Sequence, residues 1–252
     1  STGPGDSCRL IAINLFGSVR NPFSKEAFFD YKKFYGVVYE AQRLSDDLVD
    51  LELEAIKKIF TTIENDPEPD YIKNTEKRTW AVLYESGKKG RRTGLGFTAL
   101  ADTLAALDLK FDSDKSLLQL DEIMRVKCQA EFDSSIDMAI ERGRFNGFDP
   151  EIEKTSEFVQ MLQKEFPKLV DRMIKYGRRN VSLSTVSPTG SVSIMSQTSS
   201  GIEPVYTLSY KRRRKINPNY KNVRVDFVDE VGDSWEEYHI FHHKFIIWLK
   251  VN

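Results

Sequence analysis

The sequence has little cysteine and no long apolar run. Its 252 residues contain two cysteines, Cys8 and Cys128, far apart and without a CxxC motif. This argues against a disulfide-stapled secreted domain and favours a reducing, cytoplasmic environment. No apolar run approaches the roughly 20 residues that span a bilayer, and no secretory signal peptide is recognisable. We therefore expect no membrane partner.

The chain also lacks a surplus of charge of either sign. It has 37 Lys and Arg against 38 Asp and Glu, a net charge of −1. A nonspecific nucleic-acid binder usually carries a basic surplus, so we expect no nucleic-acid partner. Hydrophobic residues at 40% and charged residues at 30% are typical of a globular protein. No repeat, linker or composition change marks a boundary, which predicts a single domain over 1–252. The apolar last segment and the initial Ser suggest that both ends are interior points of a longer protein.

Most of the chain has apolar residues at the three-and-four spacing of amphipathic helices. A continuous apolar run over 8–16 instead suits a strand buried on both faces, as in α/β proteins. A second strand is expected at 223–228. The fold class is therefore α/β with long helices. The expected helices are 24–64, 70–88, 98–107, 114–142, 151–175 and 234–251.

The stretch over 180–214 combines hydroxyl side chains, Gly, Pro and short β-rich runs. Residues 181–186 alternate like a strand, and we expect strand structure over 181–195. The sequence Ser187-Pro188-Thr189-Gly190-Ser191 interrupts it with a turn. Three hydroxyls and the free N–H groups of such a turn can hold an anion such as phosphate. A plain Pro-Gly turn between two strands explains the same spacing.

Two clusters of polar side chains resemble metal ligands. Asp46, Asp47, Asp50 and Glu52 crowd one expected helix, but no Glu-x-x-His motif accompanies them, so we interpret them as a solvated face. Three histidines, at 239, 242 and 243, share one face of the expected helix 234–251. No nearby acid or cysteine supports a metal site there. We therefore expect no metal.

Two further features have ordinary structural explanations. Gly94 and Gly96 form a GxG before a helix, as in dinucleotide-binding proteins. The third glycine position is Ala99 and no strand is expected before the motif, so a close-packed loop is the better interpretation. Cys128 lies inside an expected helix and is assigned a structural role. Cys8, at the start of the strand 8–16, would by itself be a small buried hydrophobe.

Four groups of residues, taken together, resemble a known family. They are DSCRL at 6–10 with INL at 13–15, EAQRL at 40–44 with DDLVDLE at 46–52, GRRTGLG at 90–96, and PTGS at 188–191 with SSGIEP at 199–204. In this order they resemble the large catalytic subunit of ribonucleotide reductase over nearly the whole chain. The sequence motifs AQRL…DDLVDLE and GRRTGLG are similar to those of the adenosylcobalamin-dependent class II branch.

The resemblance implies a ten-stranded α/β barrel built from two five-stranded parallel halves, of which this chain would be the second. Cys8 matches the family's redox-active cysteine, one of a pair that becomes a disulfide as the ribose 2′-OH leaves. Ser7 beside it and the loop residues Ser187, Pro188, Thr189, Gly190 and Ser191 are then expected to bind the substrate, the loop holding its phosphate. Further candidates in the nearby segment are Ser199, Ser200 and Glu203.

The same resemblance places important parts outside the sequence. The family's thiyl-radical cysteine would fall upstream of Ser1, as would the redox partner of Cys8. The allosteric N-terminal region and the C-terminal dithiol tail are also expected elsewhere. Neither Cys8 nor Cys128 is assigned as the radical carrier.

We therefore expect a fragment of a class II ribonucleotide reductase, inactive alone. Adenosylcobalamin would be the cofactor and a ribonucleoside di- or triphosphate the substrate. The upstream portion of the enzyme and a thioredoxin-like reductant would be its partners. Unpaired edges of the strands 8–16 and 181–195 would favour self-association. The alternatives are a non-catalytic nucleotide-binding or assembly module and a fragment of a class I large subunit, which uses a separate radical-generating subunit.

Overall fold

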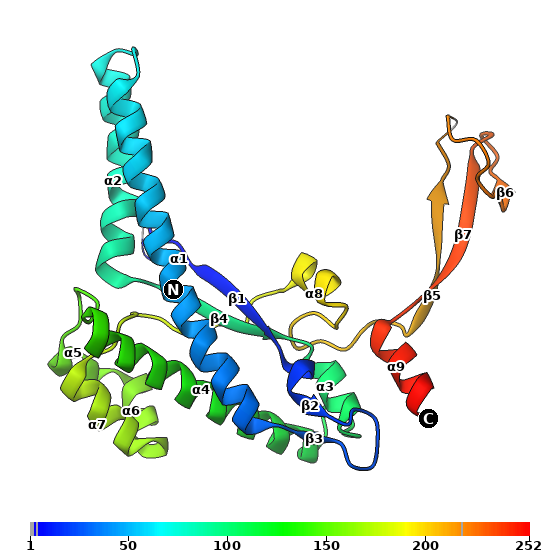
Figure 1. Cartoon of the computed structure of the whole chain (residues 1–252), viewed down its shortest axis with the longest axis horizontal. Helices are drawn as coiled ribbons and strands as arrows, with labels where there is room; N and C mark the ends of the chain where they lie inside the picture. Colours follow the sequence, from blue (N-terminus) through cyan, green and yellow to red (C-terminus); the bar gives the residue numbers. More distant parts are fainter. Residues whose placement is uncertain (1–2, 4, 218) are drawn as a thin grey trace.

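The computed structural model describes residues 3, 5–217 and 219–252. Helices and short strands alternate along most of the chain (Figure 1). The strands are β1 (Arg9–Asn14), β2 (Val19–Arg20), β3 (Phe28–Phe29), β4 (Thr93–Thr98), β5 (Ser209–Lys215), β6 (Phe227–Val228) and β7 (Ser234–Phe241). The helices are the 3₁₀ turn Leu15–Ser18 and α1 (Tyr31–Asn65), α2 (Asp70–Gly90), α3 (Leu100–Ala106), α4 (Asp114–Arg142), α5 (Pro150–Thr155), α6 (Glu157–Glu165), α7 (Pro167–Tyr176), α8 (Gly190–Ser196) and α9 (His243–Val251).

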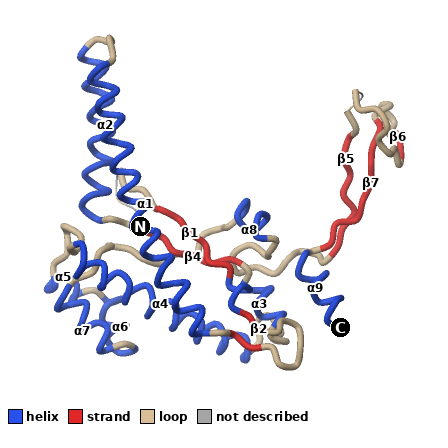
Figure 2. The backbone as a smooth tube through the Cα atoms, in the orientation of Figure 1, coloured by secondary structure: helices blue, strands red, loops and turns tan. Residues whose placement is uncertain are grey.

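A short parallel sheet lies at the centre of the molecule (Figure 2). β1 pairs with β4 in parallel, from Arg9 opposite Thr93 to Asn14 opposite Thr98. On the other side of β4, residues 182–185 run parallel to it through an isolated bridge between Leu95 and Ser184. The expected strand over 8–16 is thus confirmed as β1, and the α/β class is confirmed. These described residues do not close a barrel, so the ten-stranded architecture stays a prediction.

The expected strand over 181–195 is mostly wrong. Only the stretch around Ser184 pairs with the sheet. From Gly190 onward the chain forms α8, which Thr189 precedes as the N-cap residue. The alternation of apolar and hydroxyl residues over 191–195 has a strand-like period, but the turn at Pro188 and Gly190 redirects the chain away from the sheet.

The core consists of two apolar clusters. The first lies where β1, β4, α1, α3 and α4 meet, around Phe34, Leu95 and Ile123. The second lies between α4 and the helices α6 and α7, around Ile136 and Met173. Because α1 packs along α4 and α4 contributes to both clusters, these two helices hold the sheet in a fixed frame.

Local chemistry explains the helix boundaries. The helix 114–142 is confirmed as α4, and it begins with a reciprocal capping box between Ser113 and Ser116. The helix expected from residue 24 begins only at Tyr31, because Asp30 caps it and the preceding residues form β3 against β2. The helix expected over 151–175 is three helices, broken at Ser156 and at Pro167, where proline occupies the first turn of α7.

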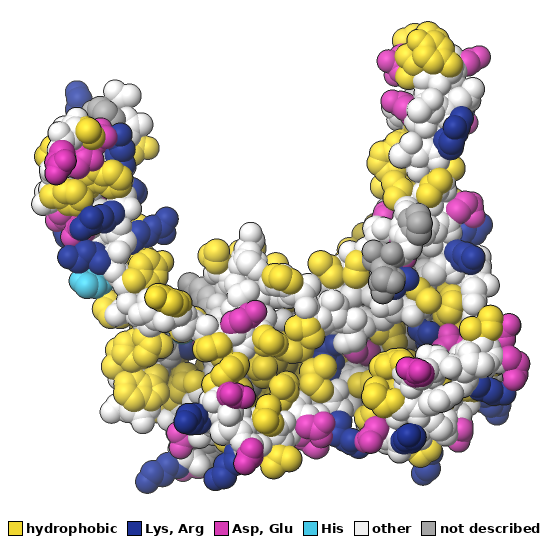
Figure 3. All heavy atoms as spheres, turned by 180° about the vertical axis from the view of Figure 1, so that it is seen from behind, with side chains coloured by type: hydrophobic (Ala, Val, Ile, Leu, Met, Phe, Trp, Pro, Cys, Tyr) yellow, Lys and Arg dark blue, Asp and Glu magenta, His cyan; other side chains and the backbone are white. Residues whose placement is uncertain are grey.

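The expected helix 234–251 is wrong in its first half. Residues 234–241 form β7, which pairs antiparallel with β5, and only residues 243–251 form the helix α9. The pairing brings acids of β7 opposite bases of β5, as in the ion pair between Arg213 and Glu237. Figure 3 shows positive and negative side chains interspersed along this arm. The basic residues Lys211–Lys215 therefore lie on a solvent-exposed strand.

Two hairpins project from the body at opposite ends (Figure 1). One consists of α2 and the second half of α1, and the other is the β5–β7 arm. Within the described ranges, no helix combines the length and the apolarity that a membrane crossing needs. The outer edge of β1 has no strand partner among the described residues, so self-association through this edge remains a prediction.

Candidate functional site

Cys8 lies immediately before β1, exposed and without a disulfide partner. Its Sγ atom lies directly over Gly94 of the neighbouring strand, where an added β-carbon would be 2.5 Å from the sulfur. The methyl group of Thr185 borders the same space, 3.3 Å from that position. The GxG motif thus makes room for a thiol, and the expected loop at 90–98 is in fact a strand, β4, buried along its whole length.

Charged side chains surround this thiol. Burial raises the pKa of Cys8, while Arg92 and Arg9 lower it and Asp6 raises it again. The net direction is upward, so Cys8 is a protonated thiol at neutral pH. An exchange-competent thiol in an exposed position can be oxidised, but it is not an activated nucleophile.

Ser7 lies beside Cys8 but faces the protein. Its hydroxyl donates to Glu52 at 2.9 Å, and Arg9 forms an ion pair with the same carboxylate. Glu52 therefore serves to fix the start of β1, and the expected substrate contact of Ser7 stays a prediction.

The predicted phosphate loop lies at the other end of β4. Thr189 is buried, and its Oγ1 atom lies 2.9 Å from Oγ1 of Thr98, the last residue of β4. The same oxygen accepts from the backbone N–H of Gly201 at 3.0 Å and lies 3.2 Å from the hydroxyl of Ser200. Thr189 is thus the anchor of the loop.

The remaining loop residues surround this anchor. Pro188, Gly190 and Ser191 are exposed and Ser187 is half-buried. The hydroxyls of Ser187 and Ser191 make no hydrogen bond within the described part of the chain, so they are available to a ligand.

The segment from Ser199 to Glu203 packs against the same strand end. Thr98 donates its hydroxyl proton to the carbonyl of Ser199 at 2.8 Å, and the backbone N–H of Ser199 donates to Asp102 of α3 at 2.7 Å. Glu203 is exposed. The structure therefore brings Thr189, Ser199 and Ser200 together, while Glu203 lies exposed beside them.

Two residues of this region, Thr98 and Asp102, were missed by the sequence reasoning. Thr98 ends a strand, and hydroxyls at strand ends commonly meet neighbouring loops. Asp102 lies in the first turn of a helix, where an acid is ordinary. Nothing in the local sequence of Thr98 or Asp102 indicates that they contact the segment 198–201. About a hundred residues separate them from that segment in the chain.

The sequence profile of the ribonucleotide reductase barrel domain matches residues 4–238. The chain belongs to this family. The vitamin B12-dependent ribonucleoside-diphosphate reductase of Mycobacterium tuberculosis is 27% identical over 210 residues, which cover 83% of this chain and 23% of that protein. The protein of the same name from Thermoplasma acidophilum is 27% identical over 212 residues, 83% of this chain and 21% of its own length. The chain thus spans under a quarter of these relatives.

A different match covers less of the barrel domain. The ribonucleoside-diphosphate reductase subunit alpha of Treponema pallidum is 26% identical over 128 residues, or 50% of this chain and 15% of that protein. The resemblance found in the motifs is therefore confirmed at the level of the family. The relatives whose names state this activity are proteins much longer than this chain.

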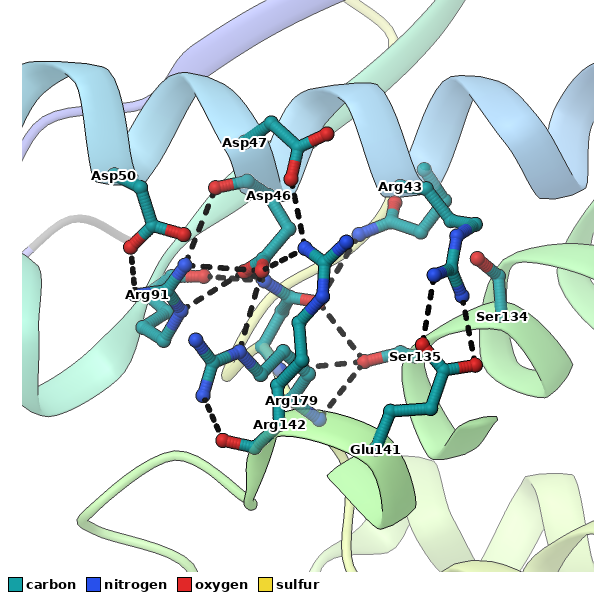
Figure 4. A network of polar contacts seen from close by, with 12 residues as sticks. Arg43, Asp46, Asp47, Asp50, Arg91, Ser134, Ser135, Glu141, Arg142 and Arg179 are labelled. Carbon is teal, nitrogen blue, oxygen red and sulfur yellow. Dashed lines mark hydrogen bonds and ion pairs between the residues drawn. The ribbon is translucent and has the colours of Figure 1, made fainter. Parts of the chain in front are cut away.

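A buried network of charges lies between α1, α4 and the segment that precedes the phosphate loop of this ribonucleotide reductase barrel domain (Figure 4). Asp46 is fully buried, with one oxygen 2.9 Å from Nε of Arg91 and the other 2.9 Å from Nη2. Asn180 donates to Asp46 at 2.8 Å, and Arg179 donates to it at 3.2 Å. These contacts join α1 to the chain that leads into the phosphate loop.

The network corrects the interpretation of the acids as a solvated face. Asp47 and Asp50 are half-buried, but Asp46 has no exposed surface. Ligand oxygens of the three aspartates lie within 4.8 Å of one another. Guanidinium groups occupy both oxygens of Asp46, which is the arrangement of a charge-paired structural network.

A second buried pair holds the middle of β4. Lys127 of α4 is fully buried and donates to the carbonyl of Leu95 at 2.7 Å and to the hydroxyl of Ser184 at 2.6 Å. It also forms an ion pair with the buried Glu131. Burial raises the pKa of Glu131 to about 7, although Lys127 and Ser184 lower it. Lys127 thus fixes residues 182–185 against β4.

The three histidines do not share a helical face, because the expected helix is a strand followed by a helix. His239 lies on β7, His242 precedes α9 and His243 begins it. Nε2 of His242 lies 2.8 Å from Oδ1 of Asp102. The acid that the sequence reasoning did not find near these histidines is therefore Asp102, which lies 140 residues away in the chain.

Proposed function

We propose that the chain supplies a substrate-phosphate cradle and one reducing thiol to an enzyme that converts ribonucleotides to 2′-deoxyribonucleotides. One observation carries this proposal. β4 bears Gly94 beneath the thiol of Cys8, and it bears Thr98 against Thr189 of the loop. The four residue steps between Gly94 and Thr98 span about 13 Å. A nucleotide lying along the strand can direct its ribose toward Cys8 and its phosphates toward the loop.

The chemistry assigned to Cys8 is a two-electron donation. Loss of the ribose 2′-hydroxyl as water consumes two electrons, and two thiols provide them by forming a disulfide. Cys8 is exposed, as exchange with a partner thiol requires. Cys128 is not the partner thiol: burial in α4 beside the second apolar cluster raises its pKa to about 12. The partner thiol would come from the upstream portion of the enzyme, and a thioredoxin-like reductant would restore the pair.

The phosphate cradle is assigned to hydroxyls and backbone amides. Thr189 is fully engaged inside the protein and fixes the loop. Ser187 and Ser191 have hydroxyls that are free of partners within the described residues, and Gly190 between them is exposed. Each hydroxyl and amide can donate to a phosphate oxygen. We assign Ser187, Gly190 and Ser191 to direct contact and Thr189 to positioning.

We assign the whole enzyme to the cobalamin-dependent class. The two relatives named as vitamin B12-dependent match 83% of the chain, against 50% for the alpha subunit of Treponema pallidum. One cavity in the described part of the chain has a volume of about 860 Å³, which is the size of a site for a drug-sized ligand. A corrinoid is larger than this cavity.

Calorimetry with pyrophosphate tests the cradle on the chain itself. We expect millimolar or tighter binding, weakened several-fold in Ser191→Ala because one hydrogen bond to a charged ligand is lost. Thr75→Ala, an exposed hydroxyl on α2, is the matched control. Absence of heat at millimolar pyrophosphate would contradict a preformed cradle.

Complementation tests the thiol. The chain is mixed with the upstream portion of the enzyme and adenosylcobalamin, and deoxynucleotide formation is measured. Cys8→Ser should abolish turnover with a physiological reductant, whereas Cys128→Ser should retain it. Turnover that survives Cys8→Ser would remove Cys8 from the reaction, and turnover without cobalamin would assign the enzyme to the class with a separate radical-generating subunit.

A further inference from the structure

The start of β4 places an arginine on the face of the sheet that carries the thiol. A β-carbon at Gly94 would point at Sγ of Cys8, 2.5 Å away. Residue 92 precedes Gly94 by two positions, and alternate residues of an extended chain point to the same face. In the parallel register of β1 and β4, Arg9 lies opposite Thr93, so Cys8 and Arg92 both come directly before this pair. Arg92 and the thiol therefore lie at the same end of the two strands.

An acid from the segment before β1 holds Arg92 in place. Nε of Arg92 forms an ion pair with Oδ2 of Asp6, and the two side chains are only 19% and 7% exposed. The other carboxylate oxygen of Asp6 accepts from the backbone N–H of Ser7 at 3.0 Å. Both oxygens of Asp6 thus have fixed partners, and the carboxylate joins Arg92 to the residue that precedes Cys8.

The second arginine beside the thiol has an acid of its own. Arg9 is buried and pairs with Glu52 of α1. Nη1 of Arg9 also donates to the carbonyls of Ser7 and Arg92, each at 3.2 Å. Because these carbonyls belong to the segments that lead into β1 and β4, Arg9 holds the two segments together. Its charge is opposed by Glu52, as that of Arg92 is by Asp6.

These groups change the pKa of the thiol in opposite directions. Burial has the largest effect and raises the pKa of Cys8. Among the charges, Arg92 lowers the pKa most, Arg9 lowers it next, and Asp6 raises it. Burial prevails in the free thiol, which stays protonated. When a disulfide opens, the departing sulfur carries a negative charge, and a nearby guanidinium group stabilises that charge.

We propose that Arg92 is a positioning residue of the redox step, that its guanidinium group stabilises negative charge on the sulfur of Cys8, and that Asp6 limits this effect by pairing with the same group. The inference rests on the redox role of Cys8 in the proposed function. It concerns the return of the oxidised pair to two thiols.

In that step, a thiolate of an external dithiol attacks the partner sulfur of the disulfide. The S–S bond breaks, its electron pair stays on Sγ of Cys8, and this thiolate takes a proton from water. The second thiol of the reductant then releases the partner sulfur. The dithiol is oxidised to its own disulfide, and Cys8 and its partner are reduced. Arg92 acts where Cys8 is the leaving group.

The pH dependence of alkylation tests this inference on the chain itself. The rate at which iodoacetamide modifies Cys8 follows the thiolate fraction, and mass spectrometry measures it from about pH 7 to about pH 10.5. We expect Arg92→Gln to move the profile to higher pH and to lower the rate near pH 8 about three- to tenfold. Asp6→Asn should move the profile to lower pH and raise the rate by a similar factor. Arg20→Gln, which breaks the exposed pair with Asp30, is the control and should leave the profile unchanged.

The two substitutions distinguish an electrostatic role from a structural one. Either of them breaks the same ion pair, so a purely structural pair would change the rate in the same direction in both variants. That result, or unchanged profiles in both, would overturn the inference. Opposite shifts would support it, and the double variant should then fall between the two single variants.

Turnover of the complemented enzyme separates this inference from the proposed function. Turnover that is lost in Cys8→Ser, with both profiles shifted in the same direction, would overturn the role of Arg92 and leave the redox role of Cys8 intact. Opposite shifts with turnover that survives Cys8→Ser would contradict the redox role, and would retain Arg92 only as the group that stabilises charge on this thiol.

Discussion

The Sγ atom of Cys8 occupies the space that a β-carbon on Gly94 would need, 2.5 Å from its position. Real β-carbons do not approach other atoms so closely, so a side chain at this position would force the ends of the Cys8 and Leu10 side chains to move. The flanking Gly96 differs, since its β-carbon would meet Thr185 at 3.4 Å and the backbone oxygen of Ile11 at 3.8 Å, which are ordinary contacts. Of the two glycines in this motif, Gly94 alone is assigned to the thiol.

Gly94→Ala should therefore displace the thiol. The added methyl would push Sγ away from the strand and toward solvent, which relieves the burial that raises the pKa of Cys8. We expect Cys8 to react several-fold faster with iodoacetamide, measured by mass spectrometry, with Cys128 as the internal reference. Gly96→Ala should leave the rate unchanged, because 3.4 Å is an ordinary contact. Equal rates in both variants would show that the space over Gly94 has no role in placing the thiol.

Much of the local structure was predictable from the sequence. The helix 114–142 was expected from the sequence, and the capping chemistry of Ser113 accounts for its start. The turn before α8 follows from Pro188 and Gly190. These features depend on residues within a few positions of one another, so the sequence pattern contains their cause.

Features that depend on distant partners were not predictable. Asp46 resembles its neighbours Asp47 and Asp50 in sequence, and its burial among Arg91, Arg179 and Asn180 distinguishes it. These partners follow it by 45 to 134 residues.

The segment 234–241 was mispredicted for the same reason. Its apolar spacing is compatible with a helix, and the decisive fact is the pairing with β5. For the same reason, the link between Asp102 and His242 had no local signal.

The buried position of Asp46 predicts a large effect on stability. Asp46→Asn removes the fully buried charge that pairs with Arg91 and Arg179, and it leaves Arg91 with the half-buried Asp50 as its remaining acidic partner. We expect a loss of about 3–5 kcal/mol in the free energy of unfolding, as for other broken buried pairs. Urea unfolding followed by circular dichroism measures it.

Asp47→Asn is the matched control for this prediction. Asp47 also pairs with an arginine, Arg142, but its side chain is 50% exposed. An exposed pair contributes about 0–1 kcal/mol, so this variant should unfold close to the parent chain. Similar losses in both variants would mean that the network does not depend on the burial of Asp46.

The buried pair of Lys127 and Glu131 predicts how stability depends on pH. Burial raises the pKa of Glu131 from 4.5 to about 7 in the folded chain. The folded state therefore holds a proton that the unfolded state has released between these values. The contribution of Glu131 to stability is fully present below about 4.5 and is lost as the pH rises through about 7. The expected slope is at most about 1.4 kcal/mol per pH unit.

Glu131→Gln isolates this contribution. Glutamine has nearly the same shape and can still accept from Lys127, but it does not titrate. We expect urea midpoints of the parent chain to fall relative to those of the variant as the pH rises from 4.5 to 7. Glu141→Gln, an exposed position on the same helix whose carboxylate pairs with Arg43, is the control. Its pKa is lowered by that hydrogen bond, so it should not change the slope in this range. Parallel pH profiles for the parent chain and Glu131→Gln would show that Glu131 stays ionised in the folded state and that Lys127 outweighs burial.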